Sequence, residues 1–234
     1  GFDPMALDLH GRLHKEFLGI EHLEVGGFGG SAQLAGEARW KPAESWTLAG
    51  KVARFDPGTI RSGFPGALDF EMKASGAPFG AEGTLDFAFS NLRGKLRGTN
   101  ASGSGRVVLQ TEGFTFDRLR FRAGNTRLSV HGHVGAKRDL DLDFSLDADN
   151  LALLAEGARG QLQASGQLGG TSEAPVIRFE AKGSGIAHQD LKIDKLSARV
   201  NLDWRGQRES EADIAITRLT FDGRELTQFN AKLE

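Results

Sequence analysis

Apolar and polar residues alternate along much of this chain, and the alternation predicts β-strands. It is clearest from Leu140 to Asp147, where leucine or phenylalanine stands at each even position and aspartate or serine at each odd one. Successive side chains of a strand point to opposite faces of its sheet, so this stretch has one apolar and one acidic face. The same period of two predicts strands within residues 68–72, 85–89, 176–179, 200–204 and 213–216.

Turn-forming residues separate the predicted strands at intervals of roughly 8–14 residues. Examples are Gly26-Gly27, Asp56-Pro57-Gly58 and Asp222-Gly223. Helical spacing is confined to residues 150–158, where Asn150 would cap a helix of about two turns. Connections this short join neighbouring antiparallel strands, so the sequence predicts an all-β protein.

The sequence also predicts an internal repeat of about 95 residues. The positions that align are residues 18–25 with 114–121, Gly36 with Gly132 (132 − 36 = 96) and Gly66 with Gly160 (160 − 66 = 94). The copies would span about 18–112 and 113–206, each long enough for roughly six to eight strands. Both copies would lie within one elongated domain of residues 1–234, itself a fragment of a longer chain.

The apolar positions change parity inside this repeat. They are even-numbered up to Phe116 and odd-numbered from Leu119. One face stays apolar across this change only if a β-bulge or tight bend lies at Asp117-Arg118. His22 holds a similar place in the first copy. Asp190 does so in a shorter echo of the repeat, in which Gly185-Ile186 matches Gly113-Phe114 (185 − 113 = 72), and a bend in every copy would curl the sheet.

Composition excludes several classes of function. Glycine supplies 32 of the 234 residues and phenylalanine 16, while cysteine and tyrosine are absent. Without cysteine the chain has no disulfide, no thiolate nucleophile and no cysteine-bound metal. A formal net charge of −2 argues against a nucleic-acid partner or a polybasic membrane anchor. No run of 18 apolar residues occurs, and the start at Gly1-Phe2-Asp3-Pro4 lacks both Met and a signal peptide, which predicts an excised fragment.

Strand geometry predicts that the candidate catalytic and metal-binding carboxylates are surface residues of one strand. Asp139, Asp141, Asp143 and Asp147 lie on the polar face of one predicted strand. An EF-hand loop that began at Asp139 would need glycine where Phe144 stands. No Gly-x-Ser-x-Gly elbow and no Gly-Lys-Ser/Thr phosphate loop stands between a strand and a helix. We therefore expect no enzyme activity, no catalytic residue and no cofactor.

Two pairs of histidines are the remaining candidates for a metal site. His131 and His133 share one side of a strand, but the sequence fixes no further ligand near them. His10 and His14 have the helical i, i+4 spacing, but Gly11 stands where the metalloprotease motif requires glutamate. We expect these histidines to be surface residues and expect no metal site.

Several segments resemble the TamB family and its AsmA-like relatives. They form two blocks: Trp46–Val52 followed by Phe55–Pro57, Phe64–Leu68 and a break at Gly76, and Gly160–Leu162 followed by Gly166, Pro175–Ile177 and Leu191–Ile193. The resemblance covers the chain from about residue 18 onward, and it rests on pattern rather than on catalytic residues.

The resemblance implies a fold, a location and a role. The fold would be a long curled antiparallel or mixed sheet that forms an open trough, often called a β-taco, with a hydrophobic interior. The protein would lie in the periplasm of a Gram-negative bacterium, and its parent chain would carry an inner-membrane anchor and meet an Omp85-type outer-membrane protein. The family is implicated in bridge-type transfer of phospholipid between the inner and outer membranes and in outer-membrane protein assembly.

The apolar stripes are the candidate site. A single sheet must cover an apolar face by closing, by pairing with a second sheet, or by holding an apolar ligand. With the resemblance, we expect the stripes to line a groove for phospholipid acyl chains. The predicted lining residues are Leu68, Phe70, Met72, Leu85, Phe87, Phe89, Phe114, Phe116, Leu128, Val130, Leu140, Leu142, Phe144, Leu146, Leu162, Ile177, Phe179, Leu202 and Ile216.

Other functions remain open for the same residues. They would equally form the core of an ordinary β-sandwich binding module, which needs no ligand. A sheet edge that pairs with nascent outer-membrane strands by β-augmentation would make the protein an assembly scaffold without lipid transport. A carbohydrate-active enzyme is disfavoured because the chain lacks tyrosine and has few inward-facing carboxylates.

Overall fold

The computed structural model describes residues 6–80, 82–111, 113–135, 139–204, 206 and 209–233. Residues 1–4, on which the expectation of an excised fragment rests, lie outside the described residues, as does residue 112 at the predicted end of the first repeat copy. By its internal contacts the chain divides into two compact units, Gly1–Gly124 and Asn125–Glu234. Each unit is built from one antiparallel β-sheet.

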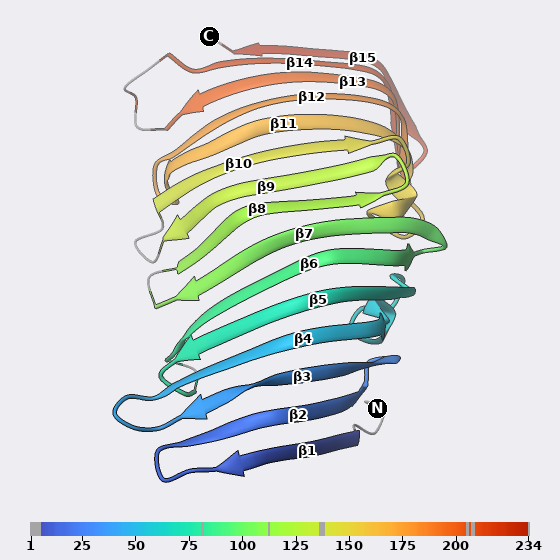
Figure 1. The fold of residues 1–234 in the computed structure, drawn as a ribbon. Coiled ribbons are helices and arrows are strands. Elements are labelled where there is room, and N and C mark those ends of the chain that lie inside the picture. Colours follow the sequence, from blue (N-terminus) through green and yellow to red (C-terminus); the bar gives the residue numbers. More distant parts are fainter. Residues whose placement is uncertain are drawn as a thin grey trace. The chain divides into compact units, whose positions relative to one another are not determined.

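The first unit forms its sheet from eight described strands in chain order. They are β1 (Ala6–Leu13), β2 (Phe17–Gly27), β3 (Gly30–Arg39), β4 (Ser45–Phe55), β5 (Gly66–Ala77), β6 (Thr84–Leu96), β7 (Thr99–Gln110) and β8 (Gly113–Ala123). Each strand pairs with the next in antiparallel register, as Figure 1 shows. A short 3₁₀ turn, η1 (Pro57–Thr59), lies in the connection between β4 and β5.

The second unit repeats this arrangement with seven described strands. They are β9 (Thr126–Gly135), β10 (Asp139–Ala148), β11 (Arg159–Thr171), β12 (Pro175–His188), β13 (Leu191–Asp203), β14 (Glu211–Phe221) and β15 (Arg224–Leu233). Successive strands again pair in antiparallel register. A second 3₁₀ turn, η2 (Leu151–Leu153), lies between β10 and β11.

The all-β prediction is confirmed, and two of its details are wrong. Every strand pairing in the described ranges is antiparallel, so the mixed-sheet alternative does not hold. The sheet within each unit neither closes nor is strongly curled. Curling was expected from a bend in every copy, but Asp190 lies in the turn between β12 and β13 and bends no strand.

The predicted bulge at Asp117-Arg118 is confirmed. The register of β7 and β8 shifts between Ser104 and Arg106, and Arg118 has a φ of 49°, in the left-handed region that few non-glycine residues adopt. A second predicted bend, at His22, coincides with register shifts on both sides of β2. These bulges keep one face of each strand apolar across the change of parity.

The two 3₁₀ turns have the same construction in both units. Asp56 caps η1 by accepting a hydrogen bond from the backbone N–H of Gly58, and Asn150 caps η2 by accepting one from the N–H of Ala152. The helix predicted at Asn150 is therefore a single 3₁₀ turn. The two caps lie 94 positions apart (150 − 56 = 94), the spacing at which Gly66 and Gly160 align.

Candidate functional site

In the first unit, cross-strand register places all eight predicted lining residues on one face of the sheet. Met72 of β5 lies opposite Phe89 of β6, and Phe87 lies opposite Val107 of β7. Directly opposite residues of antiparallel strands point to the same side, so the face continues from β5 to β8. The predicted residues on this first apolar face are Leu68, Phe70, Met72, Leu85, Phe87, Phe89, Phe114 and Phe116.

In the second unit, register likewise places the remaining eleven predicted residues on one face. Phe144 of β10 lies opposite Val130 of β9 and Gly166 of β11, and Gly166 lies opposite Phe179 of β12. The predicted residues on this second apolar face are Leu128, Val130, Leu140, Leu142, Phe144, Leu146, Leu162, Ile177, Phe179, Leu202 and Ile216. Whether lipid lies against either face stays a prediction.

The large side chains of these faces are only partly buried. No large side chain in the described ranges is less than 2% exposed, and the residues with least exposure are mainly alanines. Leu7 of β1 is 65% exposed and Phe221 of β14 is 61% exposed, although both lie on apolar faces. A two-sheet sandwich would bury most of its inward leucines and phenylalanines. Within each unit, therefore, the apolar face is not the core of a closed sandwich.

A line of phenylalanine rings crosses the first apolar face. Phe55 of β4 meets Phe70 of β5 edge-on with ring centroids 6.1 Å apart, and Phe70 meets Phe89 at 6.4 Å. Phe28 lies 6.5 Å from Phe55, and Phe87 lies 6.3 Å from Phe89. Phe28 and Phe55 were not predicted to line this face, because Phe28 lies in a turn and Phe55 follows the bulge at which β4 changes parity.

Charged residues gather on the opposite, polar faces and pair across strands. The guanidinium of Arg106 on β7 donates two hydrogen bonds to the Asp86 carboxylate on β6, one of them 2.7 Å long from Nε to Oδ1. In the second unit, Arg127 donates to Asp147 at 3.0 Å, and Arg199 lies 2.9 Å from Glu180. Exposed pairs of this kind contribute little free energy. Because the charged residues lie on the polar face, the paired positions of β1 to β8 on the first apolar face carry no charged side chain.

Asp86→Asn is expected to reduce the loss of stability in acid. The hydrogen bonds from Arg106 lower the pKa of Asp86; partial burial opposes this shift, and the charge of Arg106 adds to it. A carboxylate with a lowered pKa stabilises the fold above its unfolded-state pKa of about 3.9, and this stabilisation is lost as pH falls through the folded-state value. Thermal melts of wild type and Asp86→Asn at neutral pH and below about pH 3 measure how much stability each protein loses in acid. Asp149→Asn, at an exposed loop residue, is the control, and equal losses in Asp86→Asn and wild type would contradict the prediction.

The candidate metal ligands of the sequence lie on a polar face. His133 of β9 contacts Asp139 of β10, with Nε2 and Oδ2 3.0 Å apart, so the histidine has an acidic neighbour that spacing alone did not reveal. His131 lies opposite Asp143 in the register of the same strands. Among the described residues, no group of three or more histidine, aspartate or glutamate side chains is arranged to hold a metal ion.

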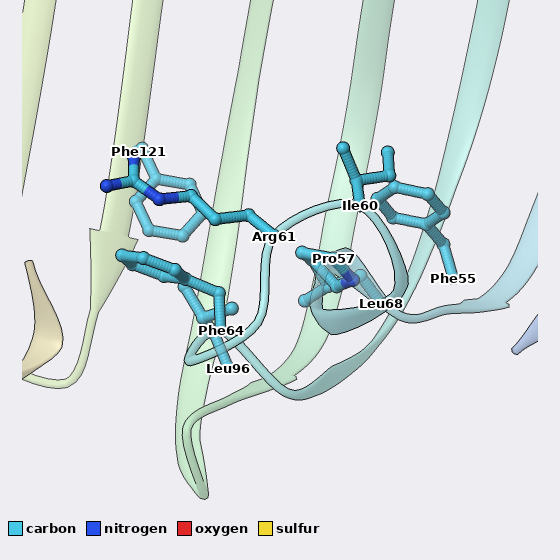
Figure 2. Close-up of a pocket in the computed structure, with 8 residues that line it drawn as sticks. All are labelled: Phe55, Pro57, Ile60, Arg61, Phe64, Leu68, Leu96 and Phe121. Atoms are coloured by element: carbon cyan, nitrogen blue, oxygen red, sulfur yellow. The ribbon is translucent and has the colours of Figure 1, made fainter. Parts of the chain in front are cut away.

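A short loop covers one end of the first apolar face. Oδ1 of Asp56 accepts hydrogen bonds from the N–H of Gly58 at 2.8 Å and from the N–H of Gly66 at 2.7 Å, which joins the two ends of the loop. The loop and the sheet enclose an open cavity of about 410 Å³, the η1 pocket, shown in Figure 2. Its lining residues are Phe55, Pro57, Ile60, Arg61, Phe64, Leu68, Leu96 and Phe121.

Comparison with known families agrees with the strand pattern. The family model described as the N-terminal domain of TamB matches residues 1–234, the whole of the chain. This chain belongs to the TamB family. None of the solved structures is a significant match to it. TamB proteins are transport and assembly proteins of the translocation and assembly module and are not known as enzymes.

The helical segments that the structure describes in this TamB domain are short. In the described ranges, the helical segments are the three-residue turns η1 and η2, and neither has the length or hydropathy of a membrane-spanning helix.

Proposed function

We propose that this TamB domain carries phospholipid acyl chains along its two apolar faces. The observation that supports this proposal is a continuous face of leucine and phenylalanine that, in the part of each unit that the structure describes, no second sheet covers. An acyl chain of ordinary length is stabilised by about 0.8 kcal/mol for each methylene removed from water, on the order of 10 kcal/mol in total. A continuous apolar surface supplies this stabilisation at each step of movement.

The proposed transport is passive and occurs in the periplasm. Acyl chains would lie against the apolar faces while head groups stay in water, and direction would come from the source and acceptor membranes. In the full-length parent, an inner-membrane anchor and an Omp85-type outer-membrane protein would provide the two ends of the path. The single elongated domain and its repeat of about 95 residues belong to this proposal as the arrangement that would make the path continuous.

Photocrosslinking tests the proposal with matched neighbours on opposite faces. A photoreactive residue in place of Phe87, Phe144 or Phe179 should give lipid adducts in cells that export the full-length protein. The same residue at Ala88, Ser145 or Glu180 moves the probe by one position and onto the polar face. Equal labelling at the apolar-face and polar-face positions would contradict the proposal, as would an absence of labelling at the apolar-face positions in folded, exported protein.

An assembly scaffold is the second candidate, favoured by one feature of the first unit. Every residue of β1 is exposed, and in the described ranges β1 pairs with β2 alone. An exposed strand is a template for β-augmentation by an outer-membrane precursor wherever its outer edge has no other strand beside it. Crosslinks from β1 to such precursors that persist in the Phe144→Arg variant would support the scaffold, because that variant blocks the second apolar face.

A further inference from the structure

Two arginines pack against Phe64, which lines one wall of the η1 pocket. Arg61 lines the pocket, and its guanidinium carbon lies 5.3 Å from the ring centroid of Phe64; both side chains appear in Figure 2. Arg97, in the turn between β6 and β7, approaches the same ring, with its guanidinium carbon 5.2 Å from the centroid. Each guanidinium thus packs against an aromatic surface beside an apolar cavity.

The positive charge of this wall has no acidic counterpart in the pocket. The lining residues include no aspartate or glutamate, and the nearby carboxylate of Asp56 is hydrogen-bonded to the ends of its own loop. Nη1 of Arg97 is buried and has no hydrogen-bond acceptor among the described residues. A buried guanidinium donor without an acceptor is unfavourable, and an anionic ligand that reached Arg97 would relieve that cost.

The corresponding loop of the second unit forms the same turn with different side chains. At the offset of 94, Arg61 corresponds to Ala155 and Phe64 to Ala158 (155 − 61 = 158 − 64 = 94). Ala155 packs against a closed apolar cluster of Ala148, Leu151 and Ala158. The first unit places a cation and a large ring where the second unit fills the space with alanines.

We propose that the η1 pocket binds the phosphate of an anionic phospholipid through Arg61 and Arg97. This inference rests on the proposed function, since it assumes that lipid lies on the first apolar face. Guanidinium groups donate paired hydrogen bonds in a geometry that matches phosphate oxygens. Phe55 and Leu68 belong both to the pocket and to the first apolar face, so an acyl chain attached to the bound phosphate continues onto that face.

Calorimetric titration of the 234-residue chain with short-chain lipids tests this site. The probes are dihexanoyl phosphatidic acid below its micelle concentration, uncharged dihexanoylglycerol, and inorganic phosphate. The double variant Arg61→Ala, Arg97→Ala should bind phosphatidic acid at least about tenfold more weakly and dihexanoylglycerol within about twofold of wild type. Arg120→Ala, which removes an exposed arginine from the polar face of β8, is the matched control and should change neither affinity.

The other possible results contradict either the phosphate site or the proposed function. Equal weakening of both lipids, or of neither, would overturn the phosphate site and leave lipid binding to the apolar face in place. Inorganic phosphate that binds as tightly as phosphatidic acid would make the pocket a small-anion site. Wild type that binds neither lipid would contradict the proposed function itself. Arg61→Ala alone guards against misfolding, because the second unit folds the same turn with alanine at that position.

Discussion

Phe144→Arg is expected to exclude lipid from the middle of the second apolar face. Phe144 lies between Val130 and Gly166 in the register, and Phe179 follows in the same row of side chains. Bringing a hydrated guanidinium into contact with an acyl chain costs several kcal/mol. A photoreactive residue at Phe179 should then give lipid adducts at about a tenth of the yield in otherwise unchanged protein, or less.

Ser145→Arg is the control for this prediction. It introduces the same charge one position along β10, on the polar face, where Ser145 is exposed and lies opposite Ser129 and Ser165. Labelling at Phe179 should stay at the level of the parent protein. Both variants require a thermal melt, since Phe144 is partly buried and its loss costs about 1–2 kcal/mol of stability. Equal labelling in the two variants would show that the face is not the path of the lipid.

Gly132→Ala is expected to destabilise the second unit by at least about 2 kcal/mol. Gly132 has a φ of 121°, a backbone conformation that L side chains rarely adopt. A Cβ built there would collide with the backbone carbonyl oxygen of Asp141 on β10. The backbone cannot move away from this collision without breaking the pairing of β9 with β10, so the midpoint of urea denaturation should fall with little change in slope.

Gly169→Ala is the matched control in the same unit. Gly169 lies within β11, has no positive φ, and a Cβ there would find its nearest neighbour 3.8 Å away, which is ordinary contact. Its denaturation midpoint should stay close to wild type or rise slightly, because alanine restricts the unfolded chain. Similar midpoints for Gly132→Ala and Gly169→Ala would mean that the close approach of β9 and β10 is not required.

The faces of the strands were predictable because they depend on a period of two and on short turns. Phe70 and Leu142 were assigned by local alternation, and antiparallel register then carried each assignment to the neighbouring strand. The bulge at Arg118 was predictable for the same reason, since only an extra residue reconciles the even and odd apolar positions. The strand faces and the bulge were thus predicted from residues that lie close together in the sequence.

The η1 pocket was not predictable from the sequence, because it joins residues that lie far apart in the chain. Leu96 and Phe121 reach it from β6 and β8, and their distance from the loop depends on how the intervening strands bend. Arg54 and Asn91 also adopt positive φ within strands although neither is glycine. Their neighbours on adjacent strands determine these conformations, and Arg54 is held there by a 2.9 Å hydrogen bond from its N–H to Asp69.

The pairing of each strand with its sequence neighbours has a consequence for how such a protein gains length. Within each unit no strand must wait for a partner from a distant part of the chain, so the sheet can form one strand at a time as the chain becomes available. Insertion of a further hairpin adds about 10 Å to the sheet and leaves the existing pairs intact. The length of such a sheet therefore increases by a fixed amount with each added hairpin. Evolution can adjust that length without changing a buried core.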